Sequence, residues 1–251
     1  GRCMKNHIPM ARPLGVRGYQ KRSYTIGTYK MNDALSVETS NEGPTAIALD
    51  IDPRTVALYA QPLTFRLDLE RVFDTKAEAR KAEPRIKSGS VSESGLECCY
   101  TPDFLVNLGE PVDLIVESKD DTEIEKLTAT LERRKQILSS LGYRYLVVRN
   151  STFAVKGFHQ NMVDVRDALQ RLSKRDCKAQ LAAMEEVVAG FSESFALGEI
   201  WDLVQPISDI HKAVATGLVA YDLRSGKLTR DTEVWPAYGD LAHLQLLPLG
   251  A

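Results

Sequence analysis

Two carboxylates and a lysine are the residues of this 251-residue sequence that are best suited to chemistry. Asp103 opens one apolar segment, and Glu117 and Lys119 lie two positions apart at the end of the next. Alternate residues of a strand point to one face, so Glu117 and Lys119 share a face and a hairpin brings Asp103 beside them. Carboxylate oxygens are preferred Mg²⁺ ligands, and an ammonium group stabilises charge on a phosphate. The pattern therefore predicts a site for metal-dependent phosphodiester hydrolysis.

The main alternative is a surface carboxylate–lysine pair on an ordinary hairpin, which would contribute little. A D…ExK pattern arises often by chance, but here each carboxylate lies beside an apolar run that is predicted to be a strand. Other catalytic patterns are missing from the sequence. There is no GxxxxGK[ST] phosphate loop, and the four histidines are scattered, at positions 7, 159, 211 and 243.

The elements around these residues predict a mixed sheet packed by helices. Thr122 and Glu125 form a capping box that begins a helix, and Gly142 ends it. The charged region 74–94 is predicted to be an inserted loop or a short helix. Asp33 to Leu49 is ambiguous, with Gly43-Pro44 marking a turn or a helix start. The apolar stripe of the long helix is Ile124, Leu127, Leu131, Leu138 and Leu141, and strands are expected at 55–59, 63–69, 98–106, 113–117 and 143–148.

The last part of the chain has a different pattern. It predicts three helices, at 178–188, at 197–204 and from Ser208 to Thr216, followed by a hairpin of 218–222 and 228–235. This is the order of a winged-helix domain. The charged run at 174–176 is the predicted boundary. The expected parts are a basic arm of residues 1–30, a domain of 31–174 and a smaller domain of 175–251.

The net charge of −2 conceals an uneven distribution. Residues 1–30 carry seven basic side chains and no acidic one, which suits contact with a polyanion such as DNA, although a solvated tail is the alternative. Residues 175–251 carry six basic and eleven acidic side chains. We therefore expect this C-terminal segment to bind a protein partner, and its helix at 208–216 not to read DNA.

Composition indicates a folded, non-membrane protein. Hydrophobic residues make up 43% of the chain, and no run of 18 apolar residues occurs. The first residues contain no apolar signal segment, so a cytoplasmic location is expected. The four cysteines have neither zinc spacing nor a disulfide framework. The neighbours Cys98 and Cys99 are predicted to be buried strand thiols, with a disulfide or a metal site as the alternative.

The motifs around the two carboxylates resemble the PD-(D/E)xK superfamily of restriction-endonuclease-like proteins. Within it the chain resembles the TnsA family, the endonuclease subunits of heteromeric cut-and-paste transposases. The matching segments are Pro102-Asp103 with Glu117-Ser118-Lys119, the run Tyr100–Val106 (YTPDFLV), the step Tyr59-Ala60-Gln61-Pro62, and Ser40-Asn41-Glu42 placed eight residues before Asp50-Ile51-Asp52-Pro53.

The resemblance implies a restriction-endonuclease-like α/β domain, with a mixed sheet flanked by helices, and a small C-terminal winged-helix-like domain. It implies that Asp103 and Glu117 bind Mg²⁺, for which Mn²⁺ substitutes, and that Lys119 is the catalytic lysine. It also implies that the Ser118 carbonyl contacts the metal and that Glu42 is the helix-borne acid completing the site. Gly43-Pro44 follows Glu42, so Glu42 begins a helix, and Glu38 is the alternative acid.

The resemblance also implies a reaction and its partners. The enzyme would cleave the 5′, non-transferred strand at transposon ends in double-stranded DNA, while a DDE transposase subunit cuts and joins the 3′ ends. An AAA+ ATPase regulator would dock on the C-terminal domain, and the setting would be the bacterial cytoplasm and its nucleoid. A restriction or defence nuclease of the same fold remains an alternative. So does a catalytically inactive factor that binds DNA and proteins.

Overall fold

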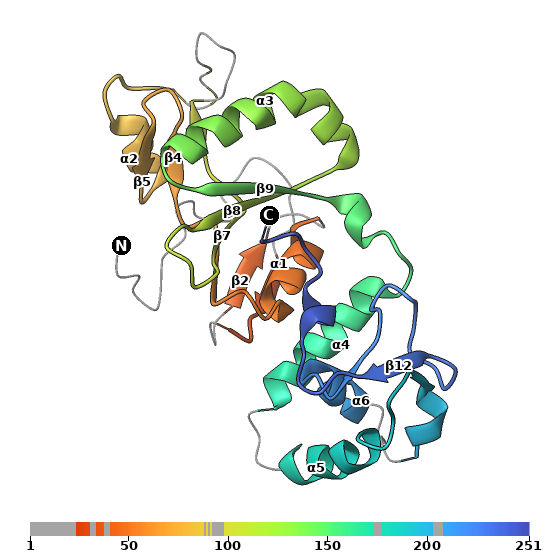
Figure 1. Cartoon of the computed structure of the whole chain (residues 1–251). Helices are drawn as coiled ribbons and strands as arrows, with labels where there is room; N and C mark the ends of the chain where they lie inside the picture. The colour runs from red at the N-terminus through yellow and green to blue at the C-terminus, as the bar shows by residue number, and fades with distance from the viewer. Residues whose placement is uncertain are drawn as a thin grey trace. The chain divides into compact units, whose positions relative to one another are not determined.

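A computed structural model describes residues 24–30, 34–37, 41–87, 89, 91, 98–172, 177–202 and 208–250. These residues form a mixed α/β structure with six α-helices and several sheets (Figure 1). They divide into two compact units. The first contains the described residues up to Ala46 together with Arg54–Ser151, and the second contains Ile47–Pro53 and the described residues from Thr152 onward.

The central sheet of the first unit has four strands in the order β3-β7-β8-β9. The strands β3 (Ala57–Ala60), β7 (Phe104–Asn107) and β8 (Leu114–Lys119) are antiparallel neighbours, and β9 (Arg144–Arg149) is parallel to β8. The long helix α3 (Asp121–Ser140) makes the crossover that a parallel pair requires. The mixed sheet packed by helices is therefore confirmed.

Smaller elements complete the first unit. A three-stranded sheet has β4 (Thr64–Arg66) between β5 (Arg71–Phe73) and β6 (Cys99–Tyr100). The helix α2 (Lys76–Lys81) is the short helix allowed for 74–94. The helix α1 (Glu42–Ile51) begins at Glu42, and its residues from Ile47 onward are grouped with the second unit. The pair β1 (Tyr24–Gly27) and β2 (Ala34–Val37) was not predicted.

The strand predicted for 98–106 is in fact two strands. The first, β6, ends at Tyr100 and pairs with β4, whereas β7 begins at Phe104 and pairs with β3 and β8. Pro102 lies between them and has no N–H to donate to a ladder, so the strand breaks there. The break leaves Asp103 at the edge of the central sheet, directly before the first residue of β7.

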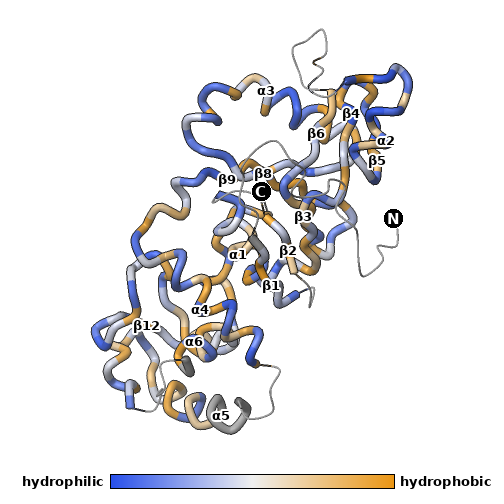
Figure 2. Tube along the Cα trace, turned by 180° about the vertical axis from the view of Figure 1, so that it is seen from behind, coloured by the Kyte–Doolittle hydropathy of each residue, from blue (hydrophilic) through white to orange (hydrophobic). Residues whose placement is uncertain are grey.

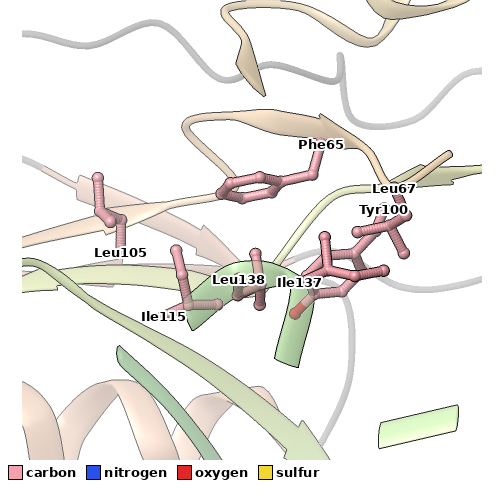
Figure 3. Packing of buried hydrophobic residues seen from close by; sticks show 7 residues of the cluster. All are labelled: Phe65, Leu67, Tyr100, Leu105, Ile115, Ile137 and Leu138. Atoms are coloured by element: carbon pink, nitrogen blue, oxygen red, sulfur yellow. The ribbon is translucent and has the colours of Figure 1, made fainter. Parts of the chain in front are cut away.

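The core of the first unit lies under the C-terminal half of α3. Seven buried side chains from β4, β7, β8, α3 and the segments beside them form one cluster (Figure 3). Ile137 and Leu138 contribute to it, whereas Leu127 of the predicted stripe is 39% exposed. Figure 2 shows that much of α3 is hydrophilic. The predicted stripe is therefore wrong in its N-terminal part, because the helix extends beyond the apolar surface that it covers.

The predicted cap of α3 is also corrected. The chain is still extended at Asp120, whose side chain accepts the N–H of Thr122. Asp120 is therefore the N-cap, and the helix begins at Asp121, before the expected Thr122. At the other end, Gly142 has a φ of 83°, a conformation that glycine adopts without strain, and the helix ends there as predicted.

The second unit contains helices and a small sheet. Its helix α4 (Phe158–Arg171) was not predicted, and it packs against α6 (Ser208–Ala215), so the unit begins at Thr152 and the boundary expected at 174/175 falls inside it. The helix expected at 197–204 is a short 3₁₀ turn, Leu197–Ile200, and residues 203–207 lie outside the described part. The remaining elements are α4 (Phe158–Arg171), α5 (Cys177–Val188), α6 (Ser208–Ala215), and an antiparallel sheet in which β12 (Glu233–Pro236) lies between β10 (Phe195–Ala196) and β11 (Val219–Ala220), with 3₁₀ turns at Asn150–Phe153 and Ala242–Leu244.

Two further expectations concern membranes and thiols. None of the helices in the described part of the chain combines the length and the apolar character needed to cross a bilayer. Cys98 and Cys99 are both buried, as predicted, and neither is in a disulfide. Cys3 and the side chain of Cys177 lie outside the described residues.

A fully buried arginine joins the small sheet to the loop after α2. The guanidinium of Arg66 makes two bonds of 2.8 and 2.7 Å to the carboxylate of Asp68. It also donates to the carbonyl oxygens of Ala79, Ala82 and Pro84, at 2.8, 3.1 and 3.0 Å. These bonds satisfy a charge that burial would otherwise make costly, and they hold the segment 79–84 against β4.

We expect Arg66→Met to destabilise the protein by about 3 kcal/mol, because it leaves Asp68 without its partner and frees three carbonyl groups. Urea unfolding followed by circular dichroism measures this change. Arg85→Met is the matched control, since Arg85 pairs with Glu83 at the surface and its loss should cost less than about 0.5 kcal/mol. Equal losses for the two variants would contradict the role given to Arg66.

Candidate active site

The pairing of β7 with β8 positions the site. Phe104 is paired with Val116, so the preceding Asp103 is opposite Glu117 on the neighbouring strand. On its other side the Asp103 carbonyl accepts the backbone N–H of Gln61 at 2.9 Å. The backbone of Asp103 is therefore held by Gln61, and the hairpin brings it beside Glu117 as predicted.

Asp103 lies in an environment that disfavours its negative charge. Burial, followed by the charges of Glu42 and Glu117, raises the pKa of this carboxyl to about 7. One backbone N–H, that of Ser118, donates to its Oδ2 at 2.8 Å and acts in the opposite direction, as does Lys119. The carboxyl thus changes its charge near neutral pH, and a bound cation would favour the ionised form.

Glu117 is surrounded by hydrogen-bond donors. Arg134 Nη1 donates to its two oxygens at 2.9 and 2.7 Å. The Tyr100 hydroxyl donates to Oε2 at 2.9 Å, and the Tyr145 hydroxyl donates to the same oxygen. Burial alone would raise the pKa of Glu117, but Arg134 and Lys119 outweigh it and hold the pKa below its ordinary value. Glu117 is therefore ionised in the structure.

Lys119 is adjacent to both carboxylates. Its Nζ lies 3.1 Å from Glu117 Oε1, which confirms that the two side chains share a face of β8. Burial lowers the pKa of Lys119, but Glu117 and Asp103 more than compensate, so the pKa lies above its ordinary value. The Lys119 side chain is 25% exposed, whereas that of Glu117 is 5% exposed. A charged ammonium group is thus presented at the accessible edge of a buried cluster, unlike a simple surface pair.

The first turn of α1 brings Glu42 to the other face of β8. Ser118 Oγ donates to the Asn41 carbonyl at 2.9 Å and lies 3.0 Å from the Thr45 hydroxyl. Glu42, the first residue of the helix, is buried and acts on the charge of Asp103. Glu42 therefore begins the helix as expected. Its alternative, Glu38, lies outside the described residues, as do residues 1–23 of the basic arm.

The structure places Asp103 opposite Glu117 and pairs Lys119 with Glu117, and Glu42 begins α1, from where its charge acts on Asp103. Sequence reasoning missed Arg134 and assigned no role to Tyr100 or Tyr145. A signal for Arg134 was present. It lies three residues after Leu131 and four before Leu138, so it interrupts an apolar stripe at helical spacing. An arginine in such a stripe requires a buried acidic partner.

The chemistry of these side chains suits a hard divalent cation such as Mg²⁺, because carboxylate oxygens are its preferred ligands and the charges of Glu42 and Glu117 both act on the Asp103 carboxyl. Their present arrangement is not a finished metal site. Across the described residues, no three His, Cys, Asp or Glu side chains converge closely enough to hold a metal ion. The oxygens of Glu117 are engaged by Arg134, Lys119 and the two tyrosines.

A concave feature lies in the second unit. A cavity of about 650 Å³ is enclosed by α4, α6 and the turn at 226–228. Its charged lining is mostly basic, although the C-terminal segment as a whole is acidic. The docking surface expected there is therefore not uniformly acidic. The charged and titratable lining residues are Lys156, Asp164, Asp167, Arg171, His211, Lys212 and Lys227.

Comparison with known proteins finds no matching family model and no significantly similar curated protein.

The raised pKa of Asp103 predicts a pH-dependent stability for the metal-free protein. Between about pH 4 and pH 7 the folded protein keeps a proton that the unfolded chain has lost, so this carboxyl makes stability fall as pH rises. Asp103→Asn removes the effect. We expect its stability relative to the wild type to increase across this range, by at most about 4 kcal/mol at pH 7.

Urea unfolding in chelator at several pH values measures the difference. A difference between wild type and variant that stays constant from pH 4 to pH 7 would contradict the environment described for Asp103.

Proposed function

We propose that the protein is a Mg²⁺-dependent DNA endonuclease of the TnsA type, which cleaves the 5′ strand at transposon ends. The observation that carries this proposal is the electrostatic environment of Asp103, a half-buried carboxyl opposite Glu117 on which the charges of Glu42, Glu117 and Lys119 all act. Two or more carboxylates with one lysine are the groups that metal-assisted phosphodiester hydrolysis uses. The sequence resemblance supplies the specific biological role.

In this proposal each residue has a defined task. Asp103 and Glu117, with Glu42 and the Ser118 carbonyl, would hold Mg²⁺, and Mn²⁺ would substitute for it. The ion supplies a Lewis acid that polarises the scissile phosphate. The ammonium of Lys119, held by Glu117 at 3.1 Å, orients the attacking water and stabilises negative charge on the phosphate. The Ser118 N–H holds Oδ2 of Asp103, so Oδ1 would be the oxygen that binds the ion.

The fold supports the proposal at a coarser level. The four-stranded sheet with α3 as its crossover is compatible with a restriction-endonuclease-like domain, since the carboxylates lie where β7 and β8 meet. In the second unit the order α5, β10, 3₁₀ turn, α6, β11 and β12 is compatible with a winged-helix domain.

The burial of α6 argues against a DNA-reading role for this helix. The side chains of Ile210, Val214 and Ala215 are buried, and every other side chain of residues 210–215 is buried or half-buried. The helix packs against α4. A helix must present several side chains to read the major groove, so α6 is unsuited to that task. We propose that this unit docks the AAA+ ATPase regulator, and that a DDE transposase subunit completes the enzyme on DNA.

Removing one metal ligand or the lysine should abolish cleavage. We expect Asp103→Ala and Lys119→Met each to reduce the rate of duplex DNA cleavage at least about 100-fold in Mg²⁺ or Mn²⁺, in the presence of the transposase partner. Lys119→Met should still bind Mn²⁺, because an ammonium group is not a ligand.

Gel analysis of end-labelled DNA measures both rates. Glu110→Ala is the matched control, because Glu110 is an exposed acid on the hairpin between the same two strands and its loss should leave cleavage unchanged. Cleavage at wild-type rate by Asp103→Ala would exclude Asp103 from the site.

The basic N-terminal arm and the second unit should contribute differently to DNA affinity. Deleting residues 1–23 removes six basic side chains. If four of them contact phosphates, the slope of log K against log salt should become shallower by about 3.6, which is 0.9 per phosphate. Lys212→Ala on α6 should leave the affinity within about twofold.

Fluorescence anisotropy with a labelled duplex at several salt concentrations measures both changes. An unchanged slope after the deletion, or a large loss from Lys212→Ala, would reverse the assignment of the DNA-binding region.

A further inference from the structure

Glu117 accepts more hydrogen bonds than a carboxylate readily holds. Its two oxygens offer about four lone-pair positions. Arg134 approaches both oxygens, Lys119 approaches Oε1, and the Tyr100 and Tyr145 hydroxyls approach Oε2. A cation bound by Glu117 would have to replace at least one of these donors, since none of the oxygen lone pairs remains unclaimed.

Arg134 is the donor whose replacement matters most. It is held in the interior, where its guanidinium carbon lies 3.9 Å from the centroid of the Tyr100 ring. Its Nη1 bonds both oxygens of Glu117, and the charge of each partner strengthens these bonds beyond those of neutral groups. Its Nε is buried and has no hydrogen-bond partner among the described residues. The side chain is therefore anchored by packing and aimed at a single carboxylate.

Asp103 presents the opposite case. The structure records one hydrogen bond to its carboxylate, from the Ser118 N–H, within the described residues. The two facing carboxylates of the site are thus unequal. One is open to a ligand, and the other is held by a guanidinium, an ammonium and two hydroxyls.

We infer that Arg134 is a positioning residue that competes with a divalent cation for Glu117. The inference rests on the proposed metal-dependent function. In the metal-free protein Arg134 and the two tyrosines hold Glu117 against α3. The metal ion and Arg134 compete for the same Glu117 oxygens. Pairing with Arg134 therefore weakens metal binding by Glu117, and metal binding weakens the Arg134–Glu117 pair by the same factor. The ion is then bound well only when α3 releases the carboxylate.

The test is Mn²⁺ affinity, measured by calorimetry on the full chain without DNA. We expect Arg134→Gln to tighten Mn²⁺ binding about tenfold or more, because it removes a charged competitor. Tyr145→Phe removes one neutral donor and should tighten binding about threefold. Arg134→Lys keeps the charge and should lie closer to the wild type. In a Glu117→Gln background neither Arg134→Gln nor Tyr145→Phe should change the affinity further.

Arg144→Gln is the matched control. Arg144 is on the same strand as Tyr145 but pairs with Glu110 at 2.8 Å, so Mn²⁺ affinity should not change. Circular dichroism shows whether Arg134→Gln is folded. If it is too unstable to purify, Tyr145→Phe alone carries the test. Unchanged or weaker Mn²⁺ binding in the variant or variants that fold would overturn the inference.

The outcomes separate this inference from the proposed function. Mn²⁺ binding that depends on Asp103 but is unaffected by Arg134→Gln and Tyr145→Phe would refute the role of Arg134 and leave the nuclease proposal intact. Absence of Mn²⁺ binding in the wild type and in every variant would refute both. Binding that appears only in Arg134→Gln would support the inference in its strongest form.

Discussion

The register between β7 and β8 is the constraint on which the site depends. Because Phe104 pairs with Val116, Asp103 lies opposite Glu117, and its side chain reaches the Ser118 N–H. The parallel pairing of β8 with β9 aligns Ile115 with Tyr145, so that the tyrosine points to the face that carries Glu117. A slip of one residue would move Glu117 and Lys119 to the opposite face and separate them from α3.

The two facing carboxyl groups of the site differ in how well their charge is compensated. Glu117 is compensated by Arg134 and Lys119, whereas Asp103 has two acidic neighbours and one backbone donor. Such an imbalance costs stability unless a further cation is bound, and functional sites commonly retain costs of this kind. The stability cost at Asp103 and its suitability for a metal ion have the same electrostatic origin.

Much of the first unit could be predicted from sequence, because its signals are local. The hairpin and the Glu117–Lys119 spacing follow from strand periodicity, and Gly142 ends α3. Periodicity alone does not reveal the break at Pro102, because apolar residues precede and follow it, although proline cannot donate to a ladder. Leu127 was placed in the core because periodicity alone does not reveal where the covered surface ends.

Long-range contacts could not be predicted in the same way. The pairing of Arg134 with Glu117 joins a helix to a strand, and neither residue has a local pattern that names the other. The helix α4 belongs to the second unit because of its packing on α6, which no boundary signal near residue 174 could reveal. The part of a site that is set by packing between elements requires the structure.

Proton release on metal binding tests the central claim most directly. Calorimetric titration of Mn²⁺ at pH 6, in buffers of different ionisation enthalpy, counts the protons released. If the ion binds at Asp103, whose pKa is raised to about 7, binding should release close to one proton, and Asp103→Asn should remove this release. Mn²⁺ binding without proton release, or release that persists in Asp103→Asn, would contradict a metal-dependent site centred on Asp103.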